Sequence, residues 1–205
     1  MRMHPDFKLY IMEAIMKISV LKKQARATMQ GNWGISILVM LVVMAISGVV
    51  DSVTGGLGIW VTPVLYVGVA SFYLTMARNG SAPFETVFTD TFSDFLRKWG
   101  ATLLTMLYTA LWMLLFIIPG IVKSYSYAMT RYILLDNPEL TADQAITKSR
   151  EMMDGYKWKL FLLDLSFIGW HLLAGITCGL VYLYALPLLD AAKAQFYQEL
   201  KQIKG

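Results

Sequence analysis

The stretch from Gly100 to Val122, GATLLTMLYTALWMLLFIIPGIV, shows what kind of protein this is. It contains no Asp, Glu, Lys or Arg, and it exceeds the roughly 20 residues that a helix needs to cross about 30 Å of hydrocarbon. A charge at the bilayer centre costs about 2.5 to 3.5 kcal/mol, so a charge-free stretch of this length indicates a membrane span. Three more stretches share the property: Asn32–Val50, Ser52–Ala77 and Leu165–Leu189.

The composition supports the same conclusion. Of the 205 residues, 57% are hydrophobic and 16% are charged, and the mean hydropathy is +0.53. These values argue against a water-soluble globule and leave little chain for a soluble catalytic domain. The single cysteine, Cys178, excludes an internal disulfide, and two histidines cannot form a Cys/His zinc cluster. We therefore expect no metal and no cofactor.

We predict an all-α, polytopic membrane bundle of about six spans. The Gly-rich turn Asp51–Gly58 makes the first two spans a hairpin, and Ile118-Pro119-Gly120 ends the third. Residues 159–197 are too long for one crossing, so we place a turn at Gly175–Gly179; the alternative is a GxxxG contact inside one long helix. The predicted spans are about 33–50, 57–77, 100–118, 120–135, 160–177 and 179–197.

The cations fix the orientation. With both termini in the cytoplasm, sixteen of the eighteen Lys and Arg residues lie in cytoplasmic segments, and only Lys123 and Arg131 fall within a span. Five spans would put the C-terminal lysines outside. An even number of spans in the plasma membrane is therefore predicted.

Residues 1–31 are predicted to form an interfacial amphipathic helix before the integral membrane domain of residues 32–205. An apolar stripe lies beside basic residues that would sit among anionic lipid headgroups. The helix is either a plain anchor or a site for lipids or partners, and Met16 is an alternative start. The helix is too long and too charged for a cleaved signal peptide, so we expect no removal. The stripe consists of Phe7, Ile11, Ala14, Ile18, Leu21 and Ala25.

A second cytoplasmic helix is predicted between Asn137 and Lys159. Thr141 and Gln144 have the spacing of a capping box, and Gly155 is placed to end the helix. We expect it to lie along the membrane, either as a packed connector or as a binding site.

Several strings resemble a bacterial membrane-protein family, domain of unknown function 975. They cover most of the chain after residue 16, and PGIVKSYSYAM and LSFIGW are the most specific of them. The resemblance implies a multi-span bacterial plasma-membrane protein, with no activity assigned. The strings are PGIVKSYSYAM at 119–129, GNW at 31–33, LSFIGW at 165–170, KLF at 159–161 and FY at 196–197.

Ionisable residues inside spans are the candidate site, because burying them is costly unless they are paired or hydrated. Arg131 and Asp164 lie at similar distances from the cytoplasmic ends of their spans, so we predict an ion pair between adjacent helices. Alternatively, each side chain extends separately to the cytoplasmic interface. Lys123, Tyr127 and Arg131 repeat every four residues, and His171 lies at the depth of Lys123. This stripe indicates a water-filled crevice for transport or anion binding, or simply polar packing between helices.

No nucleotide-binding, hydrolase or metalloprotease motif is present, so we expect no enzyme. The net charge of +4 reflects the cytoplasmic bias and requires no nucleic acid. The leading expectation is a non-enzymatic protein that binds membrane lipids or a membrane-protein or peptide partner in assembly, regulation or envelope protection. A homo-oligomer fits either this role or the alternative, a transporter or channel for small solutes. A weaker third class is a lipid-modifying enzyme.

Overall fold

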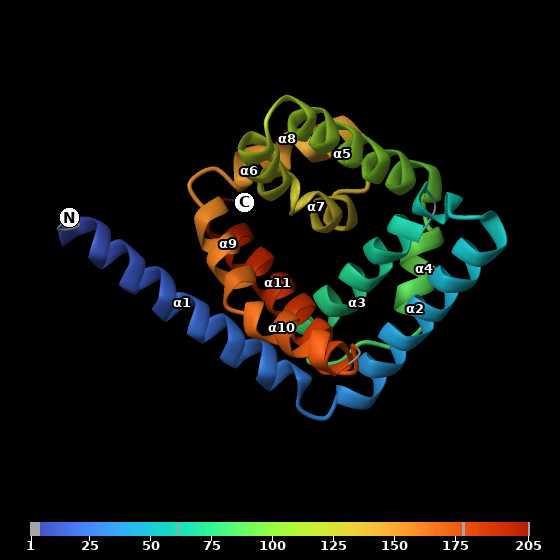
Figure 1. Cartoon of the computed structure of the whole chain (residues 1–205), viewed down its shortest axis with the longest axis horizontal. Coiled ribbons are helices and arrows are strands. Elements are labelled where there is room, and N and C mark those ends of the chain that lie inside the picture. Colours follow the sequence, from blue (N-terminus) through green and yellow to red (C-terminus); the bar gives the residue numbers. More distant parts are fainter. Residues whose placement is uncertain (1–4, 61, 178, 205) are drawn as a thin grey trace.

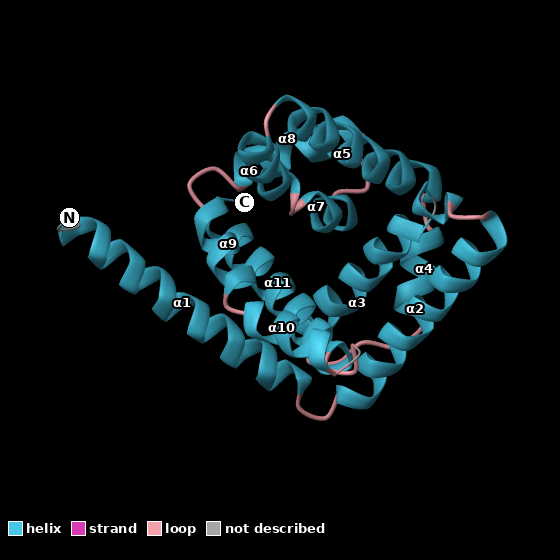
Figure 2. Ribbon diagram, in the orientation of Figure 1, coloured by secondary structure: helices cyan, strands magenta, loops and turns pink. Residues whose placement is uncertain are grey.

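The computed structural model describes residues 5–60, 62–177 and 179–204, and the side chains within these ranges from Lys17 onward. Helices joined by turns make up these residues, with no strand among them (Figures 1 and 2). This confirms the all-α class. The elements are α1 (Pro5–Met29), α2 (Trp33–Thr54), η1 (Leu57–Trp60), η2 (Thr62–Val64), α3 (Leu65–Asn79), α4 (Thr86–Phe92), α5 (Phe95–Leu115), α6 (Ile117–Tyr127), α7 (Thr130–Asp136), α8 (Ala142–Met152), α9 (Lys157–Leu165), α10 (Ile168–Ile176) and α11 (Tyr182–Lys204).

Three predicted spans are broken: 57–77 is divided into η1, η2 and α3, and two others are pairs of α-helices whose breaks are bridged by side chains. The predicted 120–135 span is α6 followed by α7, and Ser149 of α8 serves the backbone at the break: its Oγ accepts from Met129 N–H at 3.2 Å and donates to Ser126 O at 2.9 Å. The predicted 160–177 span is α9 followed by α10, and Lys22 Nζ donates to Ser166 O at 2.9 Å. Side chains from elsewhere in the chain thus replace the intrahelical bonds that each of these two breaks removes.

The two predicted turns between spans differ in outcome. Near Gly175–Gly179, α10 ends at Ile176, α11 begins at Tyr182 and Gly179 has a φ of 83°, so the chain turns here and does not continue as one long helix. The turn expected at Ile118–Gly120 lies earlier, at the extended residue Phe116. Pro119 instead falls in the first turn of α6, where the missing N–H of proline leaves no bond unmade.

The segment between α3 and α5 differs from the expected cytoplasmic connection. Helix α4 folds back along α3, where a Cβ on Gly68 would lie 3.0 Å from the carbonyl carbon of Val87. Helix α5 therefore begins beside the start of α3, and Trp99 Nε1 donates to Trp60 O at 2.7 Å. The predicted topology instead places Trp60 and Trp99 on opposite sides of the bilayer.

Helix α1 packs on α11 and α9 through Ile18, Leu21, Ala25 and Met29, which are all buried, while its N-terminal end extends away from the rest of the molecule (Figure 1). Three members of the predicted apolar stripe are therefore in the core. The side chains of Phe7, Ile11 and Ala14 lie outside the described residues.

Helix α8 packs against α5, α6 and α7, with Ala145 and Ile146 buried. The predicted capping box is present, because Thr141 Oγ1 accepts from Gln144 N–H and Gln144 Oε1 accepts from Thr141 N–H. The helix is therefore a packed connector. It lies against helices that were predicted to span.

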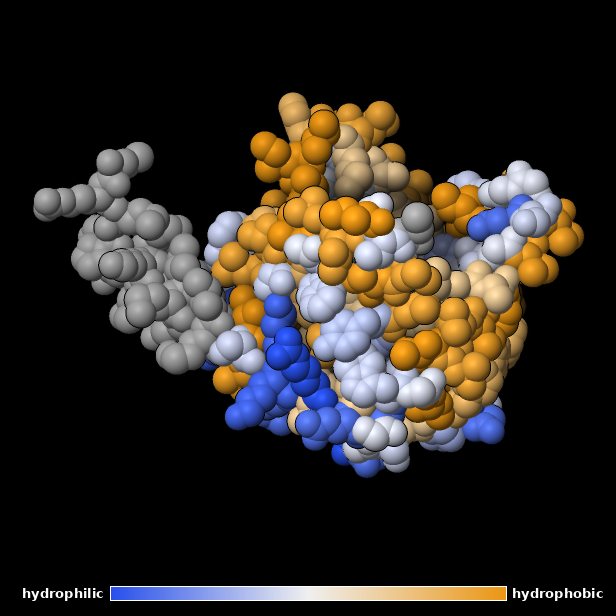
Figure 3. Space-filling model, turned by 60° about the horizontal axis from the view of Figure 1, so that its bottom comes forward, coloured by the Kyte–Doolittle hydropathy of each residue, from blue (hydrophilic) through white to orange (hydrophobic). Residues whose placement is uncertain are grey.

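Many large apolar side chains are exposed on the surface. Every large apolar side chain from Leu111 to Val122, at the tip of the α5–α6 hairpin, is between 37% and 85% exposed. Figure 3 shows hydrophobic residues over most of the visible face, with hydrophilic ones mainly along its lower part and a smaller group at the upper right. Within the described residues, two helical segments are long and apolar enough to cross a membrane, Trp33–Thr54 and Lys157–Ile176. Only 22% of an apolar 18-residue window in each segment is buried, whereas a soluble core helix is mostly buried, so the two segments suggest membrane association.

Candidate functional site

A groove of about 470 Å³ lies between α3, α5 and the broken pair α6 and α7. This volume falls within the range of about 300 to 1,000 Å³ that is typical of small-molecule sites. The fold-back of α4 creates the groove, because it places the start of α5 beside the start of α3. The lining residues used below are Val67, Thr102, Thr105, Thr109, Ala110, Tyr127, Thr130 and Arg131.

The α5 wall of the groove is less polar than its sequence indicates. The hydroxyls of Thr102, Thr105 and Thr109 each donate to the carbonyl four residues earlier, at 2.8 Å. A threonine bonded to its own helix has no donor left for a ligand and presents its methyl group. This wall is therefore suited to an apolar chain.

The opposite wall carries the polar groups. Tyr127 is buried and packs near Tyr108, with ring centroids 6.3 Å apart. Thr130 is 4% exposed, and its Oγ1 has no hydrogen-bond partner in the described part of the chain. Arg131 follows it, with its guanidinium carbon 5.4 Å from the centroid of the Tyr132 ring. Two of the five predicted site residues, Tyr127 and Arg131, thus meet in this groove.

The predicted ion pair between Arg131 and Asp164 is replaced by another. Lys193 Nζ of α11 lies 3.0 Å from Asp164 Oδ1, in a direction that makes an ion pair but not a hydrogen bond. Arg131 is attracted to both Asp190 and Asp164, more strongly to Asp190. Lys193 was predicted among the cytoplasmic cations and Asp190 was given no role, so neither was expected as a partner.

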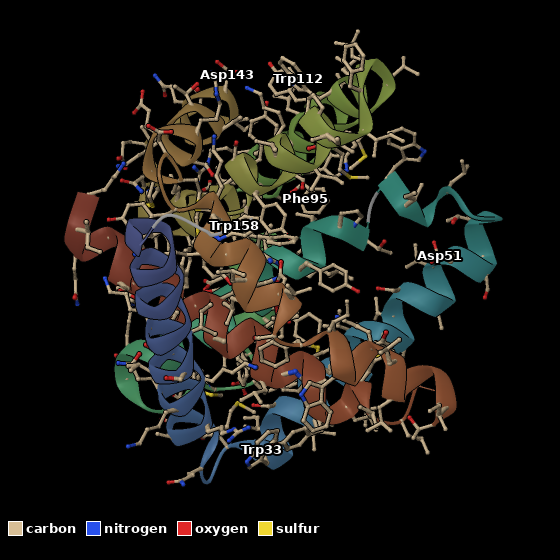
Figure 4. All side chains as sticks on the ribbon, turned by 60° about the vertical axis from the view of Figure 1, so that its left-hand side comes forward. Trp33, Asp51, Phe95, Trp112, Asp143 and Trp158 are labelled. Atoms are coloured by element: carbon tan, nitrogen blue, oxygen red, sulfur yellow. The ribbon has the colours of Figure 1, made fainter. Side chains whose placement is uncertain are left out.

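Lys123 and His171 lie outside the groove. Lys123 Nζ is 4.6 Å from the centroid of the Trp112 ring, and Arg150 and Lys157 are its electrostatic neighbours. Trp112, and therefore Lys123 beside it, lies at the same end of the molecule as Asp143, whereas Trp33 lies at the opposite end (Figure 4). His171 is exposed, with Nδ1 3.2 Å from the Tyr182 hydroxyl. Matched depth along two helices does not bring Lys123 and His171 together.

An ionic cluster that the sequence patterns do not predict surrounds Asp136 at the end of α7. Its carboxylate is 6% exposed and accepts from Arg78 at 2.6 Å, Lys201 at 2.7 Å and the Tyr197 hydroxyl at 3.0 Å. Burial alone would raise the pKa of Asp136, but the hydrogen bonds from Arg78, Lys201 and Tyr197 outweigh burial and lower it. The sequence does contain one indication of this cluster. A carboxylate at a helix C-terminus is disfavoured by the helix dipole, so it is expected to have cations nearby.

Two other cations serve backbone carbonyls. Arg97 caps the C-terminal end of α7 by donating to the carbonyls of Leu134, Asn137 and Leu140 at 3.0 to 3.2 Å. Lys22 was expected among lipid headgroups, but it bonds Ser166 and lies 4.3 Å from the centroid of the Phe167 ring. Burial, with Arg26 beside it, lowers the pKa of Lys22.

These observations define an all-helical protein with an apolar surface and an amphipathic groove. The chain belongs to the family described as "Protein of unknown function (DUF975)", whose model matches residues 101–204. The match covers most of α5 and all of α6 and α7, and it confirms the resemblance drawn from the sequence strings. No match was found among curated proteins or among solved structures.

Proposed function

We propose that this chain is a non-enzymatic integral membrane protein that binds a hydrophobic ligand in the groove between α3, α5 and α6–α7. The observation that carries the proposal is the groove itself: α5 presents threonine methyl groups on one side, and polar groups are confined to the other. Apolar pockets with a few convergent polar groups are the usual form of ligand sites. Membrane lipids are the ligands closest at hand, and a hydrophobic peptide or a second copy of the chain are other occupants.

The exposed apolar side chains support the membrane setting. A soluble monomer rarely exposes contiguous apolar patches beyond a few hundred Å², because water disfavours them. At the α5–α6 tip such side chains are consecutive in sequence, and the outer faces of α2 and α10 add Leu38, Leu41 and Leu172. Hydrocarbon is the solvent that stabilises such a surface.

The proposed topology keeps about six apolar segments in a bacterial plasma membrane, with both termini in the cytoplasm. In this topology α2 and α9–α10, the two segments long and apolar enough, cross the membrane completely, and the other four segments cross as shorter, less apolar or broken helices. Asp136 supports one shared cytoplasmic side, because Arg78, Asp136 and Lys201 come from three segments predicted to end there. Labelling of cysteines introduced near each terminus in intact cells tests this orientation.

Transport of a small solute is the second candidate. Arg131, Asp164, Asp190 and Lys193 are coupled charges on three helices, and the Tyr132 hydroxyl beside them is buried without a partner in the described residues. Partly buried charges inside a membrane protein often line ion or substrate pathways. A solute flux in proteoliposomes that is abolished by Asp190→Asn would favour this function over ligand storage.

The groove function is tested by filling the groove. Ala110 lines it from the α5 side and is exposed, so Ala110→Trp should fold and exclude the ligand. Leu107→Trp is the matched control, because Leu107 is an exposed residue of α5 outside the lining. The protein is extracted in native lipid and analysed by mass spectrometry. We expect a stoichiometric hydrophobic molecule in the wild type and in the control but not in Ala110→Trp, and equal recovery from all three would refute the groove.

A further inference from the structure

Two adjacent residues on the polar side of the groove, Thr130 and Arg131, have polar groups without a close partner in the ranges that the structure describes. Thr130 lines the groove and is more than nine-tenths buried, and its hydroxyl has no partner among the described residues. A buried hydroxyl without a hydrogen bond is destabilising, because it has given up its bonds to water and gained none in exchange. Such a group beside an open groove indicates that a ligand atom completes the bond.

Arg131 adds a charge to this position. Its guanidinium has five N–H donors, and within the described residues it makes no ion pair shorter than 4 Å. The carboxylates coupled to it are Asp190 and Asp164, and Asp164 is already paired with Lys193. The guanidinium therefore needs oxygen acceptors that the surrounding helices do not supply at contact distance.

We infer that the groove holds one anionic phospholipid, with its phosphate at Arg131 and Thr130 and its acyl chain along α5. This inference rests on the proposed function and specifies the ligand class. Arginine binds phosphate oxygens through parallel N–H bonds, and the Thr130 hydroxyl can donate to a third oxygen. The acyl chain then lies against the methyl groups of Thr102, Thr105 and Thr109, whose own hydroxyls are occupied.

Charge complementarity selects this ligand over neutral lipids. A diacylglycerol would fill the apolar side but would bring no charge to Arg131. A zwitterionic lipid brings a phosphate together with an ammonium group, whose positive charge opposes that of Arg131 in the groove lining. A phosphatidylglycerol headgroup supplies the phosphate without an added cation, so the groove should prefer it.

The experiment uses the full chain in nanodiscs of equal parts phosphatidylglycerol, phosphatidylethanolamine and diacylglycerol, followed by native mass spectrometry. We expect phosphatidylglycerol to be retained by the wild type and its retention to fall about tenfold in Arg131→Gln, because charge-assisted hydrogen bonds are lost. Thr130→Val tests the hydroxyl with almost no change in shape, and it should lower retention severalfold. Lys123→Gln is the matched control, since Lys123 is a cation on the same stretch of chain outside the groove.

Unchanged phosphatidylglycerol retention in Arg131→Gln and Thr130→Val would overturn the inference, as would an equal loss in Lys123→Gln. Retention of diacylglycerol in place of phosphatidylglycerol would also overturn it while leaving the proposed groove function intact. Loss of every lipid from the wild type, with Ala110→Trp indistinguishable from it, would refute both. Circular dichroism of each variant separates loss of the ligand from loss of the fold.

Discussion

Single side chains hold this fold together where its helices break. Ser149 completes the backbone bonds between α6 and α7, Lys22 does so between α9 and α10, and Arg97 caps the end of α7. Each is polar and comes from a different part of the chain. In an apolar surrounding an unpaired carbonyl or N–H costs several kcal/mol, so these contacts explain how short helices persist in the core.

Asp136, another single residue, predicts a pH dependence. Its pKa in the folded protein lies below the ordinary value of 3.8, so its ionised form stabilises the folded state. This contribution is fully present above the unfolded pKa of about 3.9 and is lost as the pH falls through the lower folded pKa. Asp136→Asn should therefore lower Tm at pH 7, by the loss of roughly 1 to 3 kcal/mol, and should flatten the fall in Tm below about pH 4.

Thermal unfolding in detergent at pH 7, 5, 4 and 3 measures this effect. The control is Glu139→Gln, an exposed carboxylate three residues further along the chain. If the two variants gave the same pH profile, Asp136 would not be the group that links α3, α7 and α11.

Among the helices, the α5–α6 hairpin depends on a close contact at Gly120. A Cβ at this position would lie 2.7 Å from the Cα of Met113, a backbone atom that cannot rotate away. Gly120→Ala should therefore separate the two helices and cost roughly 1 to 3 kcal/mol. The measurement is the free energy of unfolding in mixed micelles.

The matched control is Gly169→Ala in α10, where a Cβ would meet no atom within 4 Å. Alanine favours a helix over glycine by about 1 kcal/mol, so this variant should be neutral or slightly more stable. Equal destabilisation by the two substitutions would mean that the contact with Met113 does not limit the hairpin.

For the molecule as a whole, the solvent sets the energetic value of an exposed leucine. Leu114 is 85% exposed at the tip of the hairpin. In water Leu114→Lys would change stability by less than about 0.5 kcal/mol, whereas a lysine facing hydrocarbon costs about 2.5 to 3.5 kcal/mol. We expect Leu114→Lys to reduce the membrane-integrated fraction severalfold, measured after extraction with alkaline carbonate.

Leu96→Lys is the control for that experiment. Leu96 is 77% exposed at the other end of α5, beside Arg97 and Lys98, where a further cation is expected to face the aqueous side. Full integration of both variants would show that the tip does not lie in hydrocarbon.

The features that depend on local order along the chain could be predicted without coordinates. Charge-free stretches and helical spacing indicated the all-α class, the motif strings indicated the family, and Thr141 with Gln144 indicated the capping box. These features follow from which residues are three or four apart, or from the absence of charge over a span's length. Tyr127 and Arg131 were also found from their four-residue spacing, and they both line the groove although the break between α6 and α7 puts them on successive helices.

Which distant groups meet depended on the packing of the helices. Asp164 of α9 pairs with Lys193 of α11, not with Arg131, which lines the groove instead. The fold-back of α4 depends on Gly68 and brings Trp60 to Trp99, and this approach creates the groove. Depth along a helix gives one coordinate of a side chain, whereas contact also requires the rotation of each helix and the identity of its neighbours, which packing alone sets.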